Sequence, residues 1–176
     1  PQMKRISVLA SAAVLAALAL SSFPGCASYR LGSMLPPGIK TVYVPTFVNE
    51  TSEPFIEVDA TRATIQALQT DGSLKLVGSP DDADSILNVT IFSYELEPLT
   101  YDSQRRTAAN EYRLLLSARV VLTGAKTGRV ISENPLVQGQ STFDIAGDFT
   151  SSKASGLPAA VRDLGRRIVP AVVEAW

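Results

Sequence analysis

The sequence predicts an α+β fold: a two-layer sandwich in which two helices pack on one face of a mostly antiparallel sheet of four to five strands. Two segments, one after Pro54 and one near the C-terminus, repeat apolar residues at the spacing of an amphipathic helix. Five other segments alternate apolar and polar residues or are rich in β-branched residues, which is typical of strands. The expected order is strand, helix, four strands and helix.

The first 25 residues have the pattern of a secretory signal. Lys4 and Arg5 form a short basic region, and Ile6–Leu20 is almost wholly apolar. This apolar run is shorter than the roughly 20 residues that a membrane-spanning helix needs. We therefore expect residues 1–25 to be a lipoprotein signal peptide that is removed from the mature protein.

Cys26 is the one cysteine in the sequence, and it lies shortly after the apolar segment, behind the small residues Ser21, Ser22 and Gly25. Gly25–Cys26 resembles the processing site of bacterial lipoproteins, in which the cysteine sulfur takes a diacylglyceryl group and becomes the new N-terminus. Phe23 and Pro24 stand where that site usually has a leucine and a small residue. Each buried lipid methylene contributes about 0.8 kcal/mol, so several acyl chains on one residue hold a domain to a membrane. We expect Cys26 to be a lipid anchor, and a lone cysteine allows no internal disulfide.

The rest of the mature chain is predicted to be a linker and one domain. Ala27 follows the cysteine where some lipoproteins have aspartate, which favours sorting to the outer membrane. Residues 26–38 are expected to be the lipidated N-terminus and linker, and residues 39–176 a single domain. Removing residues 1–25 takes away two of the 16 basic residues and none of the 17 acidic ones, which leaves a net charge of −3. This charge disfavours a nucleic-acid partner.

The first half of the domain is predicted to contain a strand, a helix and a short strand. Lys40–Thr51 is rich in β-branched and aromatic residues, and Pro45 places this strand at an edge or bends it, because proline lacks an amide donor. The helix begins near Pro54 and ends at Asp71–Gly72. One face of this helix would carry Val58, Thr61, Ile65 and Leu68. Ser73–Val77 alternates as a short strand.

Three longer strands are predicted next. They are Ser85–Tyr94, Glu111–Thr123 and Val130–Thr142, the last interrupted by Pro135. The polar stretch Pro98–Asn110 is expected to be a long hairpin connection or an extension of the strands.

The last element is predicted to be a helix that begins between Ser151 and Ser155. One face would carry Val161, Leu164, Ile168 and Val172. Pro170 is expected to kink or divide this helix, because it removes one backbone hydrogen bond. With both helices on one face of the sheet, the other face is solvated or covered by something else.

The sequence lacks the residue patterns of the common catalytic and metal-binding sites, which argues against an enzyme. The absence of histidine removes most Ser-His-Asp and Cys-His arrangements and the usual zinc sites. The acidic run Asp81–Asp84 lacks the glycine and distal glutamate of a calcium loop, so a solvated turn is favoured. Gly124–Arg129 lacks the ending of a phosphate loop and is predicted to be a hairpin turn. Glu95 and Glu97 share a strand face, where a hydrated edge is favoured over acid–base chemistry. We expect no catalytic residue, no metal and no cofactor.

The basic residues suggest a binding role. Arg105 and Arg106 lie in the predicted connection, and Lys126 and Arg129 lie in the following turn. Two explanations of these residues stay open. They keep the surface soluble, or they bind the phosphates of a lipid or sugar, which match the forked donor geometry of the arginine guanidinium. The connection and the turn fall at opposite ends of one strand, so these residues would not form one patch.

Several stretches of the mature chain together resemble a known family. They are YRLG (29–32), LPPGIKTVYVPTFVNETSEPFIE (35–57), YELEPLTYD (94–102), EYRLLLSARVVL (111–122), GDFTSSKA (147–154) and VVEAW (172–176). In this order, after a lipoprotein cysteine, they resemble the lipopolysaccharide-assembly lipoprotein family LptE. The resemblance implies two helices on one side of a four-stranded sheet, and no catalysis.

The resemblance also implies partners. Members of the family are anchored in the inner leaflet of the outer membrane, plug a large LptD-like β-barrel and help to insert lipopolysaccharide into the outer leaflet. They also bind lipopolysaccharide, for which Arg105, Arg106, Lys126 and Arg129 are the candidate contacts here. A second function stays open, because VYVPTFVNET (42–51) also resembles the first strand of lipoproteins that activate a peptidoglycan synthase or form a curli-type secretion pore.

Overall fold

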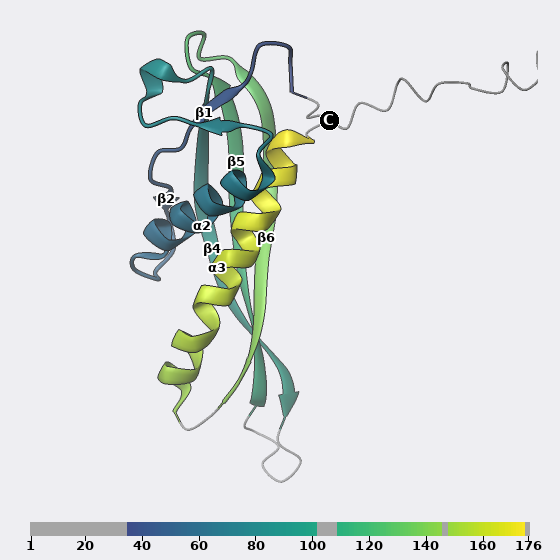
Figure 1. Ribbon diagram of the computed structural model, residues 1–176. Coiled ribbons are helices and arrows are strands. Elements are labelled where there is room, and N and C mark those ends of the chain that lie inside the picture. Colours follow the sequence, from purple (N-terminus) through teal and green to yellow (C-terminus); the bar gives the residue numbers. More distant parts are fainter. Residues whose placement is uncertain (1–34, 102–108, 146–147, 175–176) are drawn as a thin grey trace, which may run out of the picture. The chain divides into compact units, whose positions relative to one another are not determined.

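The computed structural model describes residues 35–101, 109–145 and 148–174 (Figure 1). The described residues all belong to one compact unit. The predicted signal peptide and Cys26 lie outside the described residues, and so do Arg105 and Arg106.

Two helices cover the same face of one sheet (Figure 1). In chain order the elements are β1 (Thr41–Tyr43), β2 (Val48–Asn49), α2 (Ile56–Asp71), β3 (Lys75–Leu76), a 3-10 turn (Pro80–Asp82), β4 (Ser85–Tyr101), β5 (Ala109–Gly124), β6 (Val130–Asp144) and α3 (Phe149–Val173). The α+β class and the two packed helices are therefore confirmed.

The sheet is mixed and has six strands, so it differs from the predicted mostly antiparallel sheet of four to five strands in its strand count and in its short parallel pairs. The sheet has six strands in the order β3-β1-β4-β5-β6, with β2 also pairing with β4. The β4–β5 and β5–β6 pairs are antiparallel, whereas the β1–β3, β1–β4 and β2–β4 pairs are parallel. Parallel neighbours need a crossover connection, and α2 provides it between β1 and β3.

Pro45 divides the predicted strand Lys40–Thr51 into two short pieces. β1 pairs with Ser85–Ile86 and β2 with Thr90–Ile91, so both lie along the same edge of β4. Because proline cannot donate a backbone hydrogen bond, the chain leaves the ladder between the two pieces. Phe47, in this gap, is buried, and its amide donates to Thr61 Oγ1 of α2 at 3.0 Å.

The core lies between the helices and the covered face of the sheet. Every second residue of β4 and β5 points into it, including Leu87, Val89, Ile91, Leu114, Leu116, Ala118, Val120 and Leu122. The buried face of α2 consists of Ile56, Ala60, Thr61, Thr64 and Leu68. Val58, which the sequence placed on this face, is 43% exposed. The buried face begins at Ile56 because this side chain, in the first turn, already faces the sheet.

Glycines allow close approach between the layers. A Cβ on Gly165 of α3 would lie 2.9 Å from the backbone carbon of Ala63 in α2. A Cβ on Gly139 of β6 would overlap the backbone of Leu164. Side chains at these two positions would force the layers apart, so the glycines determine how closely α3 packs on α2 and on β6.

The last helix is continuous from Phe149 to Val173 and contains both Pro158 and Pro170. The predicted start between Ser151 and Ser155 is wrong, and so is a division of the helix at Pro170. The alternative of a kink at Pro170 stays a prediction. The helix starts earlier because the Asp148 carboxylate accepts a hydrogen bond from the Ser151 amide at 2.9 Å, a normal N-cap. Both prolines are exposed, and the buried side chains on the opposite side of α3 keep the helix continuous.

Candidate partner-binding surfaces

The β4–β5 hairpin is the longest paired segment of the sheet. Its register runs from Ser85 opposite Gly124 to Tyr101 opposite Ala109. Of the two expectations for Pro98–Asn110, the strand extension applies to both of its ends, and residues 102–108 lie outside the described residues. Lys126 and Arg129 follow Gly124, so about 50 Å of strand separates them from Ala109 at the opposite end of β5.

One face of β4, β5 and β6, here called the open face, carries neither helix (Figure 1). Cross-strand partners on this face are Asn88 and Val121, Thr90 and Arg119, Glu95 and Leu115, and Glu97 and Arg113. On β6 the same face presents Glu133, Gln138, Gln140 and Thr142. The open face is therefore mainly polar, with a few aliphatic side chains between the polar ones.

The polar groups of the open face are only loosely bound to one another. Arg113 and Glu97 form an ion pair at 3.5 Å, and both side chains are more than 40% exposed. Such exposed pairs contribute about 0–1 kcal/mol. Arg119 is exposed and has no ion-pair partner within the described ranges. These groups are available to a partner at little cost to the fold.

Lys126 and Arg129 are both exposed in the β5–β6 turn. The turn is fixed beside Asp84, because the Ala125 amide donates to the Asp84 carbonyl at 2.9 Å. The pKa of the Asp84 carboxyl is lowered, chiefly by the hydrogen bond from the Lys40 amide and to a smaller extent by the charge of Lys126. The positive charge of Lys126 therefore acts partly on Asp84 within the protein, whereas the Arg129 side chain is exposed to solvent.

The acidic run Asp81–Asp84 has a structural role at this end of the sheet. Asp84 Oδ2 accepts the amides of Lys40 and Thr41, both at 3.0 Å, and the Asp84 amide donates to Thr41 Oγ1 at 2.8 Å. These bonds fix the start of β1 against β4. In the part of the chain that the structure describes, no group of three or more acidic, histidine or cysteine residues has a metal-binding arrangement.

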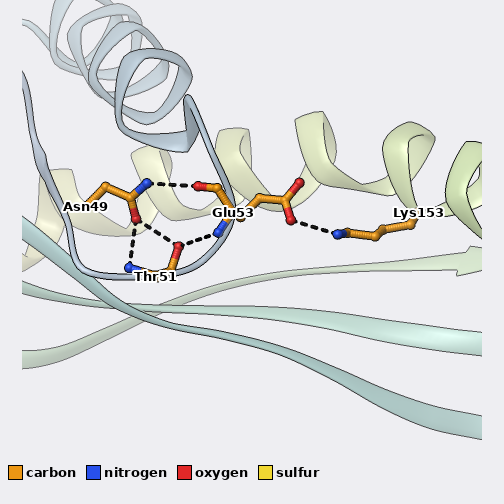
Figure 2. A network of polar contacts seen from close by, with 4 residues as sticks. All are labelled: Asn49, Thr51, Glu53 and Lys153. Atoms are coloured by element: carbon orange, nitrogen blue, oxygen red, sulfur yellow. Dashed lines mark hydrogen bonds and ion pairs between the residues drawn. The ribbon is translucent and has the colours of Figure 1, made fainter.

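A polar network before α2 was missed at the sequence level (Figure 2). The Asn49 side chain accepts from the Thr51 amide at 2.9 Å and donates to the Glu53 carbonyl at 2.8 Å. Thr51 Oγ1 in turn accepts from the Glu53 amide at 3.2 Å. The spacing Asn-x-Thr-x-Glu before a proline is a turn signal that could have indicated this loop.

The same network reaches across the fold to α3. Lys153 Nζ lies 2.7 Å from Glu53 Oε2 and 5.0 Å from the centre of the Tyr94 ring (Figure 2 shows the ion pair). The pKa of Lys153 is raised, chiefly by its hydrogen bond to Glu53, and burial raises the pKa of Tyr94. This contact joins the loop before α2, strand β4 and the beginning of α3. It therefore stabilises the packing of the helix layer on the covered face of the sheet.

None of the described helices combines the length and the apolar content needed to cross a lipid bilayer. A protein-family model described as "LptE: Lipopolysaccharide-assembly" matches residues 39–173. This match spans every described strand and both described helices. No curated protein matches the chain.

Solved structures with a similar fold come from several bacteria. A protein from Xanthomonas campestris is 10% identical with a TM-score of 0.54, over 80% of this chain and 89% of that one. A minor lipoprotein from Acinetobacter baumannii is 12% identical with a TM-score of 0.51, over 77% and 94%. A hypothetical protein from Chlamydia trachomatis is 14% identical with a TM-score of 0.50, over 78% and 97%. At these identities the likeness concerns the fold alone.

Proposed function

The chain belongs to the LptE family of lipopolysaccharide-assembly proteins, and from this premise we propose that it is an outer-membrane lipoprotein that plugs and assists an LptD-like β-barrel. The barrel inserts lipopolysaccharide into the outer leaflet, and the role of this chain is non-catalytic. The family match over residues 39–173 is the observation that carries the proposal. It favours this function over activation of a peptidoglycan synthase or formation of a curli-type pore.

The open face supports a plug role on physical grounds. The interior of a large outer-membrane barrel is polar, unlike its lipid-facing surface. A plug therefore needs a folded body with a polar outer surface. The open face has this character, because Arg119, Glu95 and Gln140 are exposed on it next to partly buried aliphatic residues.

The membrane anchor is proposed to be the lipidated Cys26. In this proposal residues 1–25 are the signal peptide, residues 26–38 carry the lipid and the linker, and residues 39–176 form the domain. The chain lies on the periplasmic side of the outer membrane and is held there through lipid.

Lipopolysaccharide is proposed to contact the two ends of β5 separately. Lys126 and Arg129 are exposed at one end, and Arg105 and Arg106 belong to the connection that leaves the other end. Guanidinium groups bind phosphate through two parallel hydrogen bonds. These contacts would serve two phosphate groups, or two stages of transfer, because about 50 Å of strand separates the two ends.

The test is affinity purification of the lipidated protein from detergent-solubilised outer membranes, with partners identified by mass. We expect a large β-barrel in stoichiometric amount. A Cys26→Ser variant is the control and should be recovered from the soluble periplasmic fraction. Recovery of a cell-wall synthase, or of a ring of this chain alone, would contradict the plug and leave the fold unaffected.

A further inference from the structure

A groove runs between the exposed sides of α2 and α3, away from the sheet. It consists of two cavities, of about 390 and 310 Å³, that share Ala63, Gln66 and Arg162. The shared residues show that the two cavities adjoin each other along the helices. The groove extends along α2 from Asp59 to Asp71, which is about 18 Å at the rise of a helix.

The floor of the groove is apolar and closed. Ala63 and Ala67 contribute small side chains from α2, and Val161 and Val169 contribute buried side chains from α3. The close contact of the helices at Gly165 leaves no gap beneath the floor. Mainly apolar cavities of about 300–1,000 Å³ with a few polar groups are typical ligand sites.

Most cations near the groove already have partners. Arg62 pairs with Asp59 at 3.2 Å. Arg166 and Arg167 both pair with Asp163, at 3.4 and 2.8 Å. Burial alone would raise the pKa of Asp163, but the hydrogen bonds from the Gln140 amide and from Arg167 lower it. Asp163 is therefore a stable anion that compensates these two arginines.

Arg162 differs from its neighbours. Its side chain is exposed, lines both cavities and has no ion-pair partner among the residues that the structure describes. A guanidinium next to an apolar channel matches a ligand with one anionic group and an apolar tail.

We propose that this groove binds one acyl chain of an anionic phospholipid, with Arg162 on the headgroup phosphate. Among the described residues that line the groove, Arg162 is the cation without an ion-pair partner, which suits one phosphate, and the carboxylate of Asp71 lies at the end of the groove. The apolar lining suits one acyl chain. This site goes beyond the proposed function, because it is separate from both the open face and the basic residues assigned to lipopolysaccharide.

The experiment is photo-crosslinking of the full lipidated protein in vesicles that contain phosphatidylglycerol with a diazirine on one acyl chain. We expect labelled peptides from both walls of the groove, 59–71 and 158–170. Arg162→Ala should reduce this labelling at least threefold, and Ala67→Trp, which fills the channel, should abolish it. Lys75→Ala removes an exposed cation of β3 that lines neither cavity and has no ion-pair partner among the described residues, so it is the control and should label like the wild type.

Further measurements test the headgroup and the chain separately. Phosphatidylcholine with the same diazirine chain should label weakly, because its headgroup carries no net charge, and inorganic phosphate should not compete. Equal labelling of the Arg162→Ala and wild-type proteins would overturn the proposal. Competition by phosphate alone, or stronger competition by lipopolysaccharide than by phosphatidylglycerol, would also overturn it. Recovery of the barrel with Arg162→Ala reports independently on the plug, so failure of one proposal is distinguishable from failure of the other.

Discussion

The two faces of the β4–β5–β6 sheet are made by the same strands and differ in almost every physical respect. The covered face presents leucine, valine and isoleucine that are nearly inaccessible to solvent, and Gly139 lets α3 pack closely on it. The open face presents arginine, glutamate and glutamine with weak contacts among them. The difference shows that the stability of the fold resides on one side of the sheet, so the other side can be selected for a partner. Adjacent residues of one strand can therefore be used to test the two roles.

The largest contrast is expected between Leu116 and Leu115. Leu116 is fully buried on the covered face, whereas Leu115 is half-buried on the open face. Leu116→Ala should lower the free energy of unfolding by about 2–5 kcal/mol, because it removes buried methyl groups and leaves a cavity. Leu115→Ala should lower it by less than about 1 kcal/mol. Equilibrium urea unfolding measures both, and equal losses would remove the distinction between the faces.

The second effect is expected at the contact between the helices. Gly165→Leu places a side chain against the backbone of Ala63, so the helices must separate. The expected cost is about 1–3 kcal/mol of overpacking. Gly78→Ala is the control, since a Cβ there meets nothing within 4 Å. A Gly165→Leu protein with the melting temperature of the control would show that the layers tolerate separation.

The third effect concerns the Lys153–Glu53 ion pair, whose side chains are 27% and 20% exposed. Lys153→Met should cost about 1–2 kcal/mol, between the values for exposed and buried pairs. Because the pKa of Lys153 is raised in the folded protein, this stabilisation holds at neutral pH and is lost as the pH rises above about 10.5. A double-mutant cycle with Glu53→Gln measures the coupling, and a coupling of zero would mean that the pair does not join α3 to the loop.

A smaller effect is expected at the start of α3. The pKa of Asp148 is lowered, chiefly by the hydrogen bond from the Ser151 amide. Its stabilisation is therefore present above the unfolded-state pKa and is lost as the pH falls through the lower folded value, below about 3.8. Side-chain carboxyl titration by NMR should show this. Asp148→Asn should keep the cap and remove the pH dependence, because asparagine caps helices well and does not titrate.

The smallest effect on stability is expected at Arg119. Arg119→Glu should leave the urea midpoint unchanged, because the side chain is exposed and pairs with no acidic group in the described part of the chain. The same substitution should reduce recovery of the β-barrel if the open face meets the barrel lumen. Unchanged recovery would place the barrel contact elsewhere on the chain.

The sequence was most informative where periodicity alone decides structure. The alternation of Leu114, Leu116 and Leu122 predicted both β5 and its buried face, since a strand repeats every two residues. Strands β1 and β3 lie within the predicted strands Lys40–Thr51 and Ser73–Val77. Their parallel pairing was not predicted, because it depends on the crossover through α2. The start of α3 depended on the side chain of Asp148, and its continuity past Pro170 depended on tertiary packing.

The candidate surfaces were predicted less well than the fold. The separation of Lys126 and Arg129 from the far end of β5 followed correctly from strand length. The Glu53–Lys153 pair joins residues 100 positions apart, and no local pattern indicates such a contact. The groove at Arg162 could not be predicted from the sequence either, because it depends on how α2 and α3 lie beside each other.

The hydrogen bond between the Gln140 amide and the Asp163 carboxylate affects how copies of the chain can pair with one another. β6 is the last strand of the described sheet, and exposed edge strands act as templates for amyloid-like growth. The Gln140 amide on β6 is occupied by the Asp163 carboxylate at 3.0 Å, and Pro135 has no amide to offer. Two backbone positions of this edge therefore offer no free amide to a second copy, which disfavours edge-to-edge pairing between copies of the chain.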